Sequence, residues 1–187
     1  MSRAVGSAGV VVTLTTAVSL APTSAFAVDY MSAEQAAQMM FPQANRFEAR
    51  TVAFDAEQLQ RLQAMGVSPR SARWQVRLAL RDGATLGYVV VDDVIGKFEL
   101  ISYAVGIGHD GTIRQVEVLS YRESHGHEIR LLAWRQQFVG KDASAPLRVG
   151  DDIANISGAT LSCSHVTEGV KRIVAVIGLA RQVGTLG

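Results

Sequence analysis

The chain has 187 residues, of which 48% are hydrophobic and 19% are charged, and its formal net charge is +1. This composition excludes a disordered or collagen-like chain, and the balanced charge gives no electrostatic footprint for a nucleic-acid partner. The single cysteine excludes an intramolecular disulfide framework and any metal site that needs a pair of cysteines. The length favours one domain.

The first 27 residues have the pattern of a secretory signal peptide. Arg3 is the only charge before Asp29, residues 4–21 are apolar or small, and Ala25-Phe26-Ala27 fits the small-x-small cleavage rule. We therefore expect cleavage after Ala27 and a periplasmic or otherwise extracytoplasmic protein. If the segment is retained, the protein is membrane-anchored instead, although a spanning helix is usually more strongly apolar.

A helix, a strand and a second helix are expected next. Ser32 followed by Gln35 is typical of a capping box and predicts a helix over residues 32–40. Alternation predicts a strand over residues 47–54. Asp55 is a second N-cap, and the helix that follows up to Met65 has one apolar face, formed by Leu59, Leu62 and Met65.

The middle of the chain has the pattern of consecutive strands. Strand-like segments cover residues 74–80, 86–91, 98–107 and 112–121, and Asp-Gly pairs mark turns at 82–83 and 110–111. Connections this short imply antiparallel neighbours.

Two further helices complete the predicted fold. Residues 127–139 predict a helix that turns Ile129, Leu132 and either Trp134 or Phe138 inward. The last helix runs from Thr160 to about Val183, with one apolar face formed by Val166, Val170, Ile173, Val174, Ile177 and Ala180. The fold class is therefore α+β: a small antiparallel sheet with helices packed on one side.

The segment Ser157-Gly158-Ala159-Thr160 lies at the N-terminus of that last helix. A permissive glycine and small side chains let a ligand approach the backbone, and the free N–H groups and positive dipole end of a helix favour phosphate. The Thr160 hydroxyl is placed to be esterified or to donate a hydrogen bond. The same residues also fit an ordinary N-cap, in which Ser157 or Thr160 caps the helix and nothing binds.

The Ser-Gly-Ala-Thr motif before an apolar helix resembles the FMN-binding domain family. That family includes subunits of the sodium-translocating NADH:quinone reductase and of the Rnf electron-transport complex. Upstream, residues 106–119, 121–129 and 134–141 are similar to further segments of the family, in the same order. The resemblance implies FMN as cofactor, esterified through its phosphate to the motif's threonine, here Thr160, by a flavin transferase that uses FAD as donor.

The resemblance also implies a set of cofactor-binding residues. Around the motif they are Ser157, Gly158, Ala159, Thr160, Leu161 and Ser162, and from upstream segments they are Glu123, Ser124, His125 and Lys141. Lys141 fits a phosphate partner and a helix-end cap equally well. We expect a signal peptide over 1–27, N-terminal elements of the same unit over 28–86, an FMN-binding domain over 87–178 and a C-terminal tail over 179–187.

Three functions follow as hypotheses. The first is an exported electron-transfer flavoprotein that works with a membrane or periplasmic redox partner rather than as a stand-alone enzyme. The second is an extracytoplasmic flavin-dependent reductase of a small substrate. The third is a non-flavin binding or assembly module whose last helix is simply capped.

Overall fold

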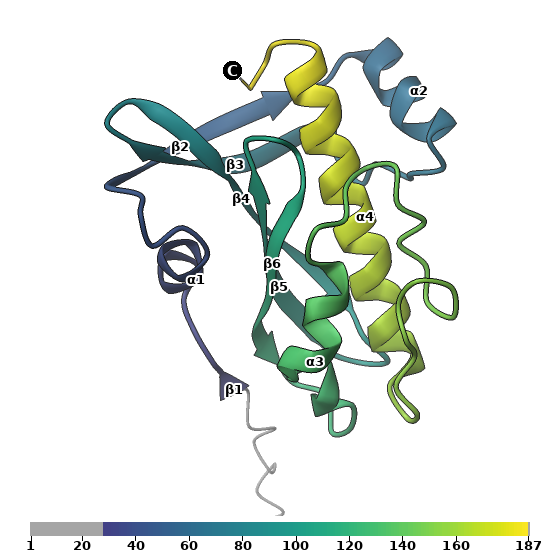
Figure 1. Ribbon diagram of the computed structural model, residues 1–187. Helices are drawn as coiled ribbons and strands as arrows, with labels where there is room; N and C mark the ends of the chain where they lie inside the picture. The colour runs from purple at the N-terminus through teal and green to yellow at the C-terminus, as the bar shows by residue number, and fades with distance from the viewer. Residues whose placement is uncertain (1–27, 187) are drawn as a thin grey trace, which may run out of the picture.

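The computed structural model describes residues 28–186, so the predicted signal peptide lies outside the described residues. One antiparallel sheet of six strands organises this part of the chain, in the order β1-β6-β5-β4-β3-β2. Strands β2 to β6 form a meander, and β1 lies beside β6 (Figure 1). The strands are β1 (Val28–Asp29), β2 (Arg46–Ala53), β3 (Arg73–Arg81), β4 (Ala84–Ile95), β5 (Leu100–Gly108) and β6 (Ile113–Tyr121).

Helices cover both faces of the sheet, which corrects the prediction of helices on one side. Helix α1 (Ala33–Met40) packs on one face, and α2 (Ala56–Ala64), α3 (Leu132–Arg135) and α4 (Thr160–Gln182) lie on the other (Figure 1). The cause is strand alternation. Small side chains such as Ala79 and Ala104 face α1, while the larger Tyr103 and Val105 pack with α4.

Two N-caps are confirmed. The Ser32 hydroxyl accepts from the Gln35 backbone N–H at 3.2 Å, and the Gln35 side chain accepts from the Ser32 N–H at 2.8 Å. Asp55 forms the same reciprocal pair with Gln58. The apolar face predicted for α2 is wrong at Met65, which is 43% exposed because the helix has already ended there.

Residues 127–139 do not form the continuous helix that their pattern predicts. A 3-10 turn (His127–Arg130), the short α3 and a second 3-10 turn (Gln136–Phe138) replace it, because Leu131 has an extended backbone with ψ of 134°. The break leaves Leu132 58% exposed, against the prediction, while Ile129, Trp134 and Phe138 are buried as expected.

Strand ends differ from the sequence pattern in two informative places. Strand β4 continues to Ile95, and β5 begins only at Leu100. The backbone N–H groups of Phe98 and Glu99 donate to the Glu123 carboxylate instead of joining the sheet. Strand β1, which the sequence did not predict, pairs Val28 with Tyr121.

The outer edge of β6 is covered over much of its length. Ile113 exchanges backbone hydrogen bonds with Gly140 and Lys141, and the Arg135 guanidinium donates to the Val116 carbonyl at 2.9 Å. Beyond these contacts, the Tyr30 N–H donates to the Leu119 carbonyl at 2.8 Å, and β1 follows.

Helix α4 lies very close to the sheet at Gly169. A Cβ atom at this position would stand 1.9 Å from the hydroxyl oxygen of Tyr103, which is fully buried and donates to Asp92 at 3.1 Å. Burial and the neighbouring Asp92 carboxylate raise the pKa of Tyr103. The last helix therefore depends on a glycine where it crosses β5. It continues to Gln182, within the segment expected as a C-terminal tail.

Within residues 28–186, no helix combines the length and apolar character needed to cross a membrane.

Candidate functional site

Helix α4 begins at the lower end of the view in Figure 1. A cavity of about 450 Å³ lies at this helix start. Three segments meet there: the turn between β4 and β5, the loop that follows β6, and the turn that precedes α4. Its volume is within the range of small-molecule sites. Its lining consists of Lys97, Phe98, Glu123, Ser124, His125, Gly158, Ala159, Thr160, Leu161 and Ser162. We call it the α4 pocket.

The first turn of α4 presents its backbone donors to this pocket. Ala159 is the N-cap residue and makes no side-chain cap bond, and the first helical bond runs from Cys163 N–H to the Ala159 carbonyl at 2.9 Å. The N–H groups of Thr160, Leu161 and Ser162 therefore precede the helical bonding pattern. The alternative in which Ser157 or Thr160 caps the helix is wrong. An uncapped N-terminus of this kind favours an anion.

Thr160 occupies the first helical position, with its side chain exposed. Its hydroxyl oxygen accepts a hydrogen bond from the Asn155 amide at 3.1 Å. The hydroxyl keeps its own proton and a second lone pair, so the contact orients Oγ1 without blocking it. Asn155 was not predicted as a site residue, because an asparagine in a loop carries no periodic signal.

Gly158 lies in the turn that leads directly into α4. Its φ is +82°, and the Ala159 N–H closes the turn on the Ile156 carbonyl at 3.0 Å. A φ near +80° at the third residue is typical of a type II turn and favours glycine. Within the described residues, no atom lies within 4 Å of a Cβ built on Gly158, so the space beside it is open to a ligand.

Glu123 joins two walls of the pocket. The side chain is buried, and one carboxylate oxygen accepts from the backbone N–H groups of Phe98 and Glu99 at 2.6 and 3.0 Å. Burial opposes ionisation, but these backbone donors prevail and hold the pKa of Glu123 below its ordinary value. The carboxylate is thus engaged by the protein, and its charge is partly neutralised before any anionic ligand approaches.

Tyr121 and Gly126 contact the start of α4, and the sequence analysis did not include them among the site residues. The Tyr121 hydroxyl donates to the His125 carbonyl at 2.5 Å and lies 3.2 Å from the Ser162 hydroxyl. Gly126 has a φ of +89°, and a Cβ there would stand 2.6 Å from both the Ala159 Cβ and the Tyr121 hydroxyl. The loop after β6 is therefore held directly against the start of α4.

The rim of the pocket is partly aromatic and apolar. Phe98 is 75% exposed and Leu161 is 46% exposed, and the Lys97 ammonium lies 4.9 Å from the centre of the Phe98 ring. Ser124 and His125 are exposed beside them, with the Ser124 hydroxyl 2.8 Å from His125 Nδ1. An exposed aromatic ring next to phosphate-binding donors suits a planar ring that carries a phosphate.

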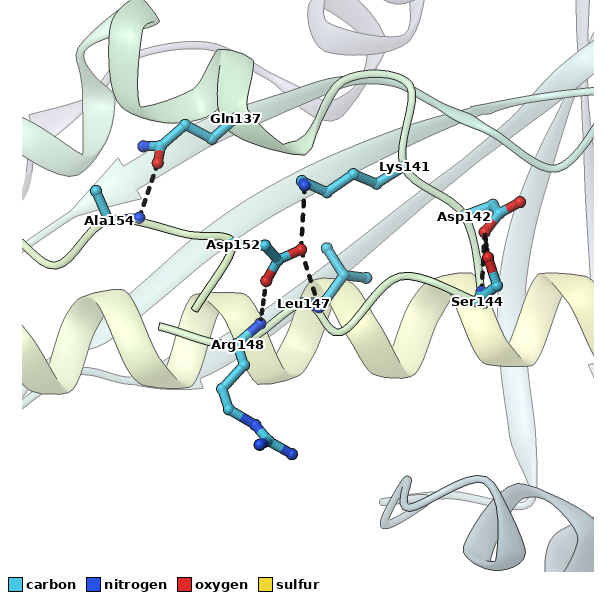
Figure 2. A network of polar contacts seen from close by, with 8 residues as sticks. All are labelled: Gln137, Lys141, Asp142, Ser144, Leu147, Arg148, Asp152 and Ala154. Atoms are coloured by element: carbon cyan, nitrogen blue, oxygen red, sulfur yellow. Dashed lines mark hydrogen bonds and ion pairs between the residues drawn. The ribbon is translucent and has the colours of Figure 1, made fainter. Parts of the chain in front are cut away.

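Two predicted site residues do not line this pocket. Lys141 instead forms an ion pair with Asp152, with Nζ 3.1 Å from Oδ2 (Figure 2). Ser157 is exposed in the turn beside Gly158, and its side chain does not cap α4. The other eight predicted residues, drawn from two distant segments, come together in the α4 pocket.

The fold and this pocket define a class: an α+β domain with a small-molecule-sized pocket at an uncapped helix N-terminus. Residues 96–175 match the FMN-binding domain family, which confirms the resemblance that the motifs carry. The cofactor of this domain is FMN. The residues of the α4 pocket fit it, since open backbone donors, an accessible hydroxyl and an exposed aromatic ring are all present.

Two solved structures share the fold of this chain. Shewanella oneidensis NqrC is 16% identical, with a TM-score of 0.53, over 80% of this chain and 88% of that chain. A subunit of the Na(+)-translocating NADH-quinone reductase from Parabacteroides distasonis is 18% identical, with a TM-score of 0.52, over 80% of this chain and 84% of that chain. No curated protein sequence matches significantly.

Proposed function

We propose that this chain is an exported flavoprotein that carries covalently bound FMN and transfers electrons outside the cytoplasm. The observation that carries the proposal is the start of α4, where Thr160, Leu161 and Ser162 line one pocket and no side chain caps the helix. When bound, FMN supplies the redox chemistry, and the protein supplies orientation and electrostatics.

Each part of the α4 pocket has a role in this proposal. The N–H groups at the start of α4 bind the phosphate oxygens, with a stabilisation of about 0.3–1 kcal/mol from the helix dipole. Asn155 orients the Thr160 oxygen through its hydrogen bond. The exposed Phe98 side chain would be available to pack against the ring system, and Glu123 fixes the turn that carries Phe98.

Attachment requires a flavin transferase with FAD as donor. In this step a bond forms between Thr160 Oγ1 and the FMN phosphorus, and the phosphorus–oxygen bond to AMP breaks. AMP leaves, and the hydroxyl proton passes to a base of the transferase. The phosphodiester that results keeps one negative charge, which suits the positive end of α4.

The redox partner belongs to the membrane or to the periplasm. Support comes from the fold, which this chain shares with a subunit of the Na(+)-translocating NADH-quinone reductase. The exposed Phe98 and Leu161 would leave one edge of a bound ring system accessible to such a partner.

One intact-mass measurement tests both export and flavin attachment. The full gene is co-expressed with a flavin transferase in a bacterium, and the extracytoplasmic fraction is analysed. We expect a yellow protein whose chain begins at Val28 and whose mass is increased by one FMN less one water. A colourless protein without the added mass would contradict the flavin proposal. A chain that begins at Met1 in the membrane fraction would contradict cleavage and indicate an anchor.

Substitution of Gly158 by valine should sharply lower flavin loading in a folded protein. A β-branched residue strains a backbone with φ of +82°, and its side chain would occupy the open space beside the turn. The measurement is bound flavin per folded protein, with circular dichroism as the folding check.

Two control variants separate this effect from general instability. Gly140 has a φ of +81° and equally open surroundings within the described residues, but it does not line the α4 pocket, so Gly140→Val should load normally. Ser164→Ala, one turn into α4, should also load normally. Full loading of folded Gly158→Val, or equal losses in Gly158→Val and Gly140→Val, would contradict this description of the site.

A further inference from the structure

The loop that leads into α4 is held by side chains from residues 132–138, which we call the α3 segment. The Ala154 backbone N–H donates to the Gln137 side-chain oxygen at 2.7 Å, and the Ala154 carbonyl accepts from the Trp134 indole N–H at 2.8 Å. Figure 2 shows the Gln137 side chain pointing toward Ala154. Two neighbouring side chains of the α3 segment therefore bind both backbone polar groups of one loop residue.

Contacts within the α3 segment orient these two side chains. Gln137 Nε2 donates to the Trp134 carbonyl at 3.1 Å, so the amide oxygen of Gln137 is left to accept from Ala154. Trp134 is buried, and a buried indole N–H needs an acceptor, which the Ala154 carbonyl supplies. The fully buried Phe138 packs edge-on against the Trp134 ring, with ring centres 5.1 Å apart. The α3 segment is thus anchored in the core where it meets the loop.

The turn just before Ala154 is held as well. The Asp152 carboxylate accepts from the backbone N–H groups of Leu147 and Arg148 at 3.2 and 2.8 Å, and it pairs with Lys141 (Figure 2). Burial opposes ionisation of Asp152, but the backbone donors and Lys141 hold its pKa below the ordinary value. The chain therefore reaches Ala154 from a turn whose position is already fixed.

Asn155 follows directly and connects this support to Thr160. Its side-chain Nδ2 donates to the Thr160 hydroxyl oxygen, five residues further along the chain, at 3.1 Å. Both residues are exposed. Because ordering an exposed side chain costs conformational entropy, a hydrogen bond of this kind depends on a backbone that is already in place. The two bonds to Ala154 hold that backbone one residue upstream.

We propose that Gln137 and Trp134 are positioning residues for the modification of Thr160: by holding Ala154, they place the Asn155 amide on the Thr160 hydroxyl oxygen. An amide N–H can only donate, so the hydroxyl keeps its proton for a base of the transferase, and a second lone pair of Oγ1 forms the bond to phosphorus as AMP leaves. This role rests on the proposed function, because it requires flavin attachment at Thr160. Neither positioning residue is among those that line the α4 pocket, so both act through the loop.

A double-mutant cycle on the rate of flavin attachment tests this role. The flavin-free exported protein is incubated with a purified flavin transferase and saturating FAD, and the fraction with the added mass is followed over time. Asn155→Ala and Gln137→Met should each slow attachment about fivefold, as loss of one neutral hydrogen bond predicts. The double variant should also be about fivefold slower, because Gln137 acts through Asn155 and the two losses do not add.

Three further variants separate positioning from general stability. Gln137→Glu keeps an oxygen that can accept from the Ala154 N–H, so it should attach flavin faster than Gln137→Met. Trp134→Phe keeps a buried ring but loses the indole N–H, so it should slow attachment as Gln137→Met does. Gln136→Met changes the neighbouring exposed residue of the same 3-10 turn and should attach flavin at the wild-type rate. Urea unfolding of each flavin-free variant is the stability check.

Hydrogen exchange at the Ala154 amide gives a second readout that needs no flavin. Followed by NMR in the flavin-free protein, exchange should be faster in Gln137→Met and unchanged in Asn155→Ala. Losses that add in the double variant, to about twenty-five-fold, would overturn the role of Gln137, and so would an Ala154 exchange rate that Gln137→Met leaves unchanged. Absence of the added mass in the wild type would instead contradict the proposed function itself.

Discussion

Thr160→Ala should abolish covalent flavin attachment completely. The substitution removes the only side-chain oxygen at the first position of α4 while leaving the backbone donors in place. The exported variant, denatured and analysed by intact mass, should show the mass of the chain alone. Retention of one FMN less one water in the denatured variant would assign the attachment to another residue.

The conservative variant Thr160→Ser separates loss of chemistry from loss of fold. Serine keeps a hydroxyl at the same point, within reach of the Asn155 amide that donates to Thr160 at 3.1 Å. This variant should therefore carry flavin. Both variants should unfold at the same urea concentration in their flavin-free forms, because the Thr160 side chain is exposed.

Gly169→Ala should destabilise the folded protein by about 2–3 kcal/mol. The added Cβ would stand 1.9 Å from the Tyr103 hydroxyl oxygen and 2.8 Å from its ring carbon Cζ. Tyr103 is fully buried, so it cannot move aside without disturbing the core between β5 and α4. Urea unfolding followed by circular dichroism gives the free energy of unfolding directly.

Gly178→Ala on the same helix is the matched control. Among residues 28–186, and apart from its own chain neighbours, the one side-chain atom within 4 Å of its Cβ would be the Ala143 Cβ, at an ordinary contact distance of 3.7 Å. Alanine is favoured over glycine inside a helix by about 1 kcal/mol, so this variant should be as stable as the wild type or more so. Tyr103→Phe combined with Gly169→Ala should recover part of the loss, because the closest atom is gone. A fully stable Gly169→Ala would show that α4 does not lie this close to β5.

Local signals allowed much of this fold to be predicted from sequence. Ser32 and Asp55 start helices where capping chemistry places them, and the Asp-Gly turns separate strands as expected. Long-range contacts account for the errors. The sequence around Leu131 looks helical, but its neighbours Ile129 and Trp134 are both buried by a bent chain. Likewise, β5 begins two residues later than predicted, because the backbone N–H groups of Phe98 and Glu99 donate to the carboxylate of Glu123, which is distant in sequence.

The sequence also predicted only part of the candidate site. The Ser157–Ser162 segment carries a recognisable motif, so most of one wall of the α4 pocket was expected. Phe98 and Tyr121 are ordinary strand or loop residues in the sequence, and only the fold brings them to the start of α4. Asn155 is near Thr160 in the chain, but its hydrogen bond to the Thr160 hydroxyl is visible only in the structure. Lys141 illustrates the opposite case, since the resemblance implied a cofactor-binding role, yet its ammonium pairs with Asp152 and it does not line the pocket.

The covered edge of β6 has a consequence for how this domain can meet other proteins. Strand addition by a partner needs a row of free backbone groups, and here Tyr30, Arg135 and the 140–141 segment already bond to that row. At the opposite edge, β2 carries Arg46, Glu48 and Arg50, charges of the kind that discourage edge-to-edge association. Neither edge invites intermolecular strand exchange or fibrillar stacking. Recognition of this domain therefore falls to side chains on its loops and helix faces.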